Sequence, residues 1–306
     1  MSTRDSIPAS ATAELAPARV GPVHDDGRRR VLARLVRTPL GAASVALTTV
    51  LCLVGLLAPA LAPHDPFAIV GPSLDPPSLD HPMGTDGLGR DLFSGVVLGT
   101  RTSLTVAGGV GMLVLAIGGA VGLLAGYRGG WTDHVLMRLA ELLQVLPRFF
   151  LAIVVIALFG PGLDRLVLVL GLTSWPILAR VVRSEVLSLK EREFVDAARA
   201  GGAGPARIVM REILPNALPT AVVYVGLLLA QVLLVEASLG FLGLGDPNVA
   251  SWGYLAGQAQ RFLRVAWWLS VFPGLAIATA VVALNLLGDA LTDALGRPGG
   301  GGGRGR

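Results

Sequence analysis

Few residues in this chain are arranged for bond-making chemistry. No serine lies in a GxSxG-type setting, and the only cysteine, Cys52, excludes an intrachain disulfide. The only lysine is Lys190, and because Glu191 follows it, a phosphate-binding GxxxxGK[ST] loop cannot be present. The histidines are scattered, without the spacing of a metal site: His24, His64, His81 and His134. The sequence therefore predicts no catalytic residue, no metal site and no bound cofactor.

Two ionisable residues, Arg148 and Glu236, lie inside long apolar stretches. Charged groups at membrane depth are costly and usually face a cavity or a partner, so we expect both residues along a translocation path. A hydrogen bond to a neighbouring helix would explain Glu236 equally well, because it lies near one end of its stretch. Arg138 and Glu141 are three residues apart and are expected to pair on one helix face.

The overall composition is apolar and poor in charge. Of the 306 residues, 53% are hydrophobic and 15% are charged, with a mean hydropathy of +0.66, whereas soluble domains average about 25% charged residues. Several apolar runs reach the ~20 residues that cross a bilayer. The pI near 10.0 does not indicate nucleic-acid binding, because the arginines flank the apolar runs. We therefore expect an all-α, multi-pass membrane protein.

The apolar runs predict six transmembrane helices within a membrane domain at residues 39–297. Their approximate bounds are 40–61, 105–126, 135–159, 163–182, 220–242 and 266–287. Residues 1–38 are expected to form a disordered, basic cytoplasmic tail, and residues 298–306 a flexible one. A cleaved secretory signal ending at Ala60-Leu61-Ala62 is the alternative for the first run. Pro63 just after the cut and the length of the run argue against it.

Glycines recur every four residues in the second run, at Gly118, Gly122 and Gly126. This small-xxx-small pattern lets helices approach closely in lipid. We expect these glycines to serve helix packing rather than chemistry.

The distribution of basic residues predicts which segments face the cytoplasm. Six spans place both termini on one side of the membrane. Sixteen of the 25 Lys and Arg residues lie in or beside the segments predicted on that side, including the loop at 183–219, and five lie in the opposite loops. By the positive-inside rule, both termini and the 183–219 loop are cytoplasmic.

The 183–219 loop holds the longest charged interruption in the second half of the chain. Residues 191–200 favour a short helix that ends at Gly201-Gly202, because glycine tolerates the positive φ of a helix end. Pro205 suits the first position of a second short helix, which we expect to end at Leu214-Pro215. The sequence thus predicts a compact helix–turn–helix between the fourth and fifth spans.

Three blocks of the sequence match one known pattern in order and in interval. Asp196-Ala197-Ala198, Gly202 and Ile213-Leu214-Pro215 match an EAA loop, with Asp196 in place of its usual glutamate. HPMGTDGLGRDLFSGVVLGTRTSL, which begins at His81, matches a segment before the second helix, with Gly87 in place of a glutamate. EASLGFLGLGDPNVASWGYL, which begins at Glu236, matches an outer block after the fifth helix. Over residues 38–297 the chain resembles the C-type permease subunits of dipeptide and oligopeptide ABC importers, a family that also includes nickel permeases.

This resemblance implies a type I ABC importer permease fold in the bacterial cytoplasmic membrane, with six transmembrane helices and both termini cytoplasmic. It implies a heterodimer with a second permease subunit, two cytoplasmic ATPase subunits that bind ATP and Mg²⁺, an extracytoplasmic solute-binding protein and the lipid bilayer as partners, without nucleic acid. The chain would move di- or oligopeptides by alternating access. The residues that the resemblance carries over to an ATPase-coupling loop are Glu193, Asp196, Ala197, Ala198, Gly202, Pro205, Ile213, Leu214 and Pro215.

Other functions stay open on the sequence alone. Nickel or another small solute is the nearest alternative, which the absence of a His/Cys cluster in the spans weakly disfavours. An ATP-independent carrier would not need a charged helix–turn–helix between spans four and five, and no internal repeat typical of such carriers is evident. An intramembrane enzyme lacks candidate catalytic residues.

Overall fold

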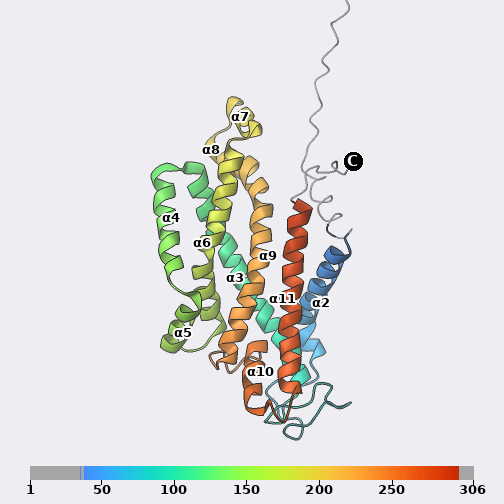
Figure 1. Cartoon of the computed structure of the whole chain (residues 1–306). Coiled ribbons are helices and arrows are strands. Elements are labelled where there is room, and N and C mark those ends of the chain that lie inside the picture. Colours follow the sequence, from blue (N-terminus) through green and yellow to red (C-terminus); the bar gives the residue numbers. More distant parts are fainter. Residues whose placement is uncertain (1–34, 36–37, 296–306) are drawn as a thin grey trace, which may run out of the picture.

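The computed structural model describes residue 35 and residues 38–295, and every regular element in that range is a helix (Figure 1). The elements are α2 (Pro39–Leu61), α3 (Leu92–Arg128), α4 (Gly130–Val145), α5 (Arg148–Phe159), α6 (Leu163–Lys190), α7 (Glu193–Ala200), α8 (Pro205–Ile208), a π-helical turn (Val209–Ile213), α9 (Leu214–Phe241), α10 (Trp252–Ala259), a 3-10 turn (Gln260–Phe262) and α11 (Trp268–Leu295). Nearly all of both predicted tails lies outside the described residues.

The long helices run side by side along one direction, with α4 and α5 along one edge and α2 and α11 along the other (Figure 1). Within the described range, five helices are long and apolar enough to cross a membrane, or six if α4 and α5 together form one bent span. The start of α2 and the end of α11 lie at the same end of the bundle as α7 and α8 (Figure 1). The predicted all-helical architecture is therefore confirmed.

The closest packing in the bundle is that of α3 on α6. A Cβ atom added at Gly122 would lie 2.5 Å from the carbonyl oxygen of Ala179 on α6, and one added at Gly126 would lie 2.8 Å from the Cβ of Val186. Real Cβ atoms do not come so close to a backbone oxygen, so only glycine allows this approach. The small-xxx-small pattern in the sequence thus corresponds to a helix–helix contact.

The other long helices pack around this pair. α9 packs on α3, α6 and α11, and α2 packs on α3 and α11. Buried aliphatic side chains from α3, α6 and α9 form one continuous core that includes Val106, Val110, Val114, Leu170, Leu178, Leu228 and Leu233. Large apolar side chains on the outer helices, such as Leu56 and Leu158, are exposed, as expected for surfaces that face lipid or another subunit.

The predicted third span, 135–159, is not one continuous helix. α4 ends at Val145, α5 begins at Arg148, and the two helices are bent by 74° relative to each other. Pro147 explains the break, because proline lacks an N–H and disfavours a helical conformation in the preceding residue. Leu146 accordingly has extended backbone angles, φ −80° and ψ 121°. The sequence predicts one span here without the break inside it, and the two helices together are long and apolar enough to cross a membrane as a bent span.

The helix expected to end at Leu214-Pro215 does not end there. The chain passes from α8 through the π-helical turn directly into α9, without a break. Pro215 is compatible with this continuation because it lies in the first turn of α9, and the wider turn before it absorbs the missing backbone hydrogen bond. Helices α3 and α6 also extend beyond the predicted spans, from Leu92 and to Lys190 respectively.

Residues 62–91 and α10 close the end of the bundle opposite α7 and α8 (Figure 1). The indole Nε1 of Trp268 donates a hydrogen bond to the carbonyl of Thr85 at 3.2 Å, and that of Trp252 donates to the carbonyl of Val96 at 3.1 Å. Both tryptophans are buried. Because each bond joins segments far apart in the sequence, the two indoles attach α10 and α11 to the region where α3 begins.

The α3–α6 contact leads to a prediction about stability. Gly122→Ala should lower the thermal unfolding temperature of the purified protein, because the new methyl group overpacks the interface at a cost of about 1–3 kcal/mol. Gly119→Ala is the matched control, because nothing lies within 4 Å of a Cβ at that position and alanine favours a helix over glycine. Equal unfolding temperatures for the two variants would contradict the packing described here.

Candidate functional site

We call residues 191–213 the elbow; it comprises α7, a glycine turn, α8 and the π-helical turn. The turn is a Schellman motif at the end of α7: the N–H of Ala203 bonds to the carbonyl of Ala198, and the N–H of Gly202 bonds to that of Arg199, each at 3.0 Å. Gly202 has φ +77°, a conformation that glycine adopts without strain. The chain therefore reverses sharply between α7 and α8, as the glycine pair predicts.

One side of the elbow is buried and the other is exposed. Val195, Ile208 and Ile213 are buried in the bundle core and hold the elbow against it. The opposite side exposes Phe194, together with most of the residues predicted for the coupling loop: Glu193, Asp196, Ala197, Gly202 and Pro205. Of the remaining predicted residues, Ala198, Leu214 and Pro215 are half-buried and Ile213 is buried. The elbow is thus a small surface on a fixed apolar base.

Asp196 does not bond to another part of the bundle. Its carboxylate pairs with Arg199 three residues on, at 2.8 Å, and both side chains are well exposed. Such a surface pair contributes little to folding stability. Asp196, the acidic residue of the EAA pattern, therefore lies on the exposed side of α7.

Two contacts join the end of α6, just before the elbow, to neighbouring helices. Arg183 on α6 makes a bidentate ion pair with Asp133 on α4, with N–O distances of 2.5 and 2.6 Å. Lys190, the last residue of α6, donates to the carbonyl of Tyr127 at 3.0 Å. The sequence analysis missed both contacts, because partners about 50 residues or more apart leave no periodic signal. Together they make the ends of α3, α4 and α6 one connected unit below the elbow.

Glu236 is buried at the other end of α9. Its side chain is only 4% exposed, and the hydroxyl of Ser103 on α3 donates to Oε2 at 3.0 Å. Ser251, which precedes α10, lies beside the same carboxyl group. The cavity there is about 10 Å³, at the lower limit of what one water requires. In this conformation Glu236 therefore connects α9 to α3 and to the start of α10. A bond to a neighbouring helix is the alternative that the sequence analysis gave to a role in the pathway.

Arg148 lies at the bend of the broken span. It is the first residue of α5, and its side chain is half-buried, with one guanidinium nitrogen 3.4 Å from the hydroxyl of Ser174 on α6. A contact of that length is weak, so most of the donor capacity of the guanidinium group is available to a ligand. Within the described residues Arg148 and Glu236 contact different partners and do not bond to each other. Arg138 and Glu141 pair at 2.9 Å on the exposed side of α4, as expected.

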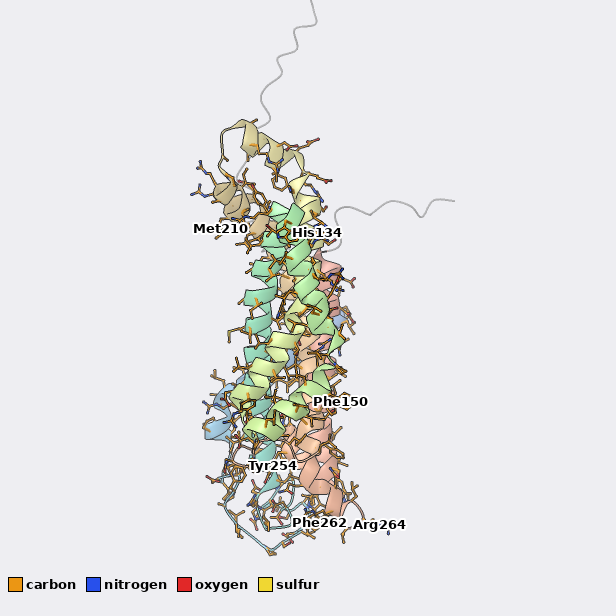
Figure 2. All side chains as sticks on the ribbon, turned by 90° about the vertical axis from the view of Figure 1, so that its left-hand side faces the viewer. His134, Phe150, Met210, Tyr254, Phe262 and Arg264 are labelled. Atoms are coloured by element: carbon orange, nitrogen blue, oxygen red, sulfur yellow. The ribbon has the colours of Figure 1, made fainter. Side chains whose placement is uncertain are left out.

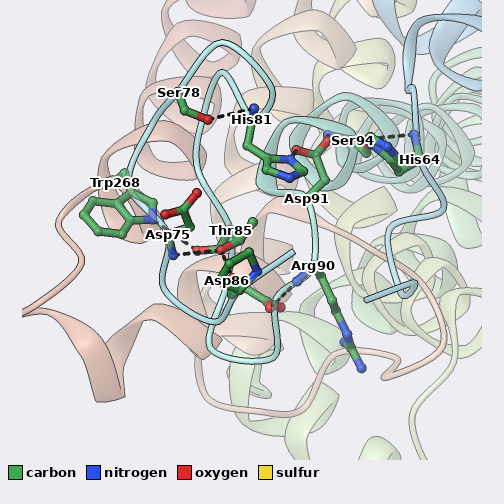
Figure 3. Close-up of polar contacts among 11 residues, drawn as sticks. His64, Asp75, Ser78, His81, Thr85, Asp86, Arg90, Asp91, Ser94 and Trp268 are labelled. Atoms are coloured by element: carbon green, nitrogen blue, oxygen red, sulfur yellow. Dashed lines mark hydrogen bonds and ion pairs between the residues drawn. The ribbon is translucent and has the colours of Figure 1, made fainter. Parts of the chain in front are cut away.

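The segment before α3 is organised around Asp91 (Figure 3). This buried carboxylate caps α3 by accepting from the backbone N–H and the hydroxyl of Ser94, at 2.9 and 2.6 Å. Its other oxygen lies 3.1 Å from Nδ1 of His81, and Nδ1 of His64 lies 3.9 Å from the group. Residues 38–295 contain no group of three metal-ligating side chains placed to hold an ion. The cluster is thus arranged as a helix cap.

Comparisons with known proteins show which family this chain belongs to. Residues 118–297, more than half of the chain, match the family of binding-protein-dependent transport system inner membrane components. The dipeptide transport system permease protein DppC of Alkalihalophilus pseudofirmus is 36% identical over 87% of this chain and 88% of its own length. The glutathione transport system permease protein GsiD of Pectobacterium atrosepticum is 42% identical over 72% of this chain and 73% of its own. A putative peptide permease of Brucella suis is 38% identical over 95% and 97%.

A solved structure shows the same fold. One chain of the MetNI methionine ABC transporter, in inward-facing conformations, superposes with a TM-score of 0.53 over 66% of this chain and 97% of its own, at 22% identity. Together with the family match, this makes the protein a multi-pass membrane subunit of a transporter rather than an enzyme. The chain belongs to the family of inner membrane components of binding-protein-dependent ABC transport systems.

Proposed function

We propose that this chain is a permease subunit of an ABC importer that moves di- or oligopeptides across the bacterial cytoplasmic membrane. The observation that carries the proposal is the elbow, an exposed surface at one end of the bundle whose base is continuous with both α6 and α9. The names of the relatives support the solute class, since they are permeases for dipeptides, glutathione and peptides. Glutathione is itself a small peptide.

In this proposal α4 and α5 form one bent span, which gives six spans and places both termini in the cytoplasm with the elbow. The positive-inside distribution of Lys and Arg supports that orientation. The end closed by residues 62–91 and α10 then faces outward, where a solute-binding protein delivers the peptide. The pathway is completed by a second, different permease subunit.

Two ATPase subunits, which bind ATP and Mg²⁺, supply the energy from the cytoplasm. One of them contacts the exposed side of α7 and the turn, near Phe194 and Asp196. Movement of that ATPase pushes or pulls α6 and α9 together, because both helices enter the elbow without an intervening flexible loop. A coupling free energy of about 1–3 kcal/mol is typical for such linked equilibria.

The turn at Gly202 provides the direct test of this coupling. Gly202→Val forces a β-branched residue into a left-handed conformation, which costs about 1–2 kcal/mol, and should reduce peptide uptake per ATP hydrolysed roughly tenfold. Gly204→Val is the matched control, because Gly204 has φ −70° and ψ 161°, and nothing lies within 4 Å of a Cβ at that position. Uptake and ATP hydrolysis are to be measured in proteoliposomes that contain the complete transporter. Normal uptake by the Gly202→Val transporter would rule out the coupling role.

Arg148 is proposed to contact the peptide at the bend between α4 and α5. A guanidinium group binds carboxylates in a bidentate manner, so Arg148→Gln should raise the half-saturating concentration for peptides with a free C-terminus. Peptides amidated at the C-terminus serve as the control and should be transported with little change. If the substitution affects both kinds of peptide equally, or neither, Arg148 does not recognise the carboxylate.

A further inference from the structure

A cavity of about 170 Å³ lies at the end of the bundle that carries α10. Most of its lining comes from the segment 62–91, α10 and the turn that follows α10, and Leu92, Ala250 and Leu269 complete it. Tyr254 and Phe262, two of its lining residues, lie near that end of the molecule in Figure 2. Since a water takes about 30 Å³ of liquid volume, the cavity can hold an acidic side chain. We call it the Arg90 pocket.

Arg90 has a cationic side chain whose bonding is incomplete. Its guanidinium carbon lies 5.3 Å from the ring centroid of Phe67, and its side chain points away from the Asp91 cluster (Figure 3). The buried Nε atom has no hydrogen-bond partner within the described residues. Arg90 lines the pocket and makes no ion pair within the described residues, so its guanidinium group is suited to an incoming acceptor.

The nearby Asp86 does not neutralise Arg90. One oxygen of its carboxylate accepts hydrogen bonds from the backbone N–H groups of Leu88 and Arg90, at 2.8 and 2.9 Å. No ion pair between the Asp86 and Arg90 side chains occurs in the described part of the chain. Asp86 therefore shapes the loop and leaves the guanidinium group available.

The opposite wall adds positive charge and a hydroxyl donor. Arg261 lines the pocket from the 3-10 turn, and no Asp or Glu occurs between Asp246 and Asp289 in the sequence. The hydroxyl oxygen of Tyr254 accepts a hydrogen bond from Gln258 at 3.0 Å, so its own O–H can donate into the pocket. The lining thus contains two arginines and one carboxylate, Asp86, whose Oδ1 already accepts two backbone N–H groups; the excess positive charge and the phenol suit an incoming carboxylate.

The position of the pocket indicates which molecule would supply that carboxylate. Its lining residues come from the outward end of the bundle in the proposed orientation, and none comes from α5, α6 or α9, which hold Arg148, Ser174 and Glu236 respectively. The pocket is therefore separate from the proposed peptide pathway and faces the side where a binding protein arrives. We propose that the Arg90 pocket receives the carboxylate of an Asp or Glu side chain of the docked solute-binding protein; this inference rests on the proposed function.

The test uses the complete transporter in lipid nanodiscs and the solute-binding protein of the same transport system. Arg90→Gln and Arg261→Gln should each raise the dissociation constant for the binding protein by about fivefold or more at low salt, and both should weaken its dependence on salt. Arg264→Gln is the matched control, because Arg264 is an exposed arginine three residues beyond Arg261 that does not line the pocket. Its dissociation constant should match that of the unsubstituted transporter.

Several results would overturn the inference. If both pocket variants bind the binding protein normally while the unsubstituted complex binds it and imports peptide, the pocket proposal fails and the proposed function stands. A changed preference for peptide carboxylates with unchanged affinity for the binding protein would assign the pocket to the substrate instead. Failure of the unsubstituted complex to bind would overturn the proposed function as well. Arg261 lies in an exposed turn, so its variant decides the question even if Arg90→Gln does not fold.

Discussion

The close approach of α3 and α6 is the constraint on which the rest of this structure depends. Glycines bring the two helices together until a single added carbon at Gly122 would meet the carbonyl of Ala179 at 2.5 Å. In lipid, where no hydrophobic force drives helices together, such contact supplies the dispersion energy that holds a bundle. Because the fit leaves no space, α3 and α6 must move as one body. In the proposed function, that rigidity lets a force applied beyond the end of α6 reach the other helices of the bundle.

The elbow is connected to that rigid pair at several points. α6 runs directly into it, α9 leaves it through the π-helical turn, and Lys190 bonds to the last turn of α3. Arg183 and Asp133 add α4 to the same unit. The bend at Pro147 separates this unit from α5. In the proposed function, this bend beside Arg148 is where a rearrangement of the pathway would divide the part connected to the elbow from the part beyond the bend.

Much of this organisation was predictable from local sequence. The run length of apolar residues, the glycine spacing at 118–126 and the Gly201-Gly202 pair each depend on neighbours in the chain, and each indicated the correct element. The continuation of α8 into α9 was not predicted, because Pro215 was interpreted as a stop signal although a proline in the first turn of a helix is tolerated. The break at Pro147 was missed for the opposite reason, since apolar residues continue on both sides of it.

Among the predicted site residues, too, local features were predictable and contacts between distant parts of the chain were not. The exposed side of the elbow followed from its motif, but its attachments did not, because Arg183 meets Asp133 only in three dimensions. Glu236 was expected in the membrane, but its bond to Ser103 joins residues 133 positions apart. The Arg90 pocket combines residues from Pro66 to Leu269, in segments that come together only when the bundle forms.

Photo-crosslinking from the elbow tests the central claim most directly. In a Cys52→Ser background, a photoactivatable group attached at Phe194→Cys should capture the ATPase subunit of the complete transporter, because Phe194 is 38% exposed on α7. The same group at Leu79→Cys, fully exposed at the opposite end of the bundle, should not capture it. Capture of the ATPase from position 79, or from neither position, would contradict the account.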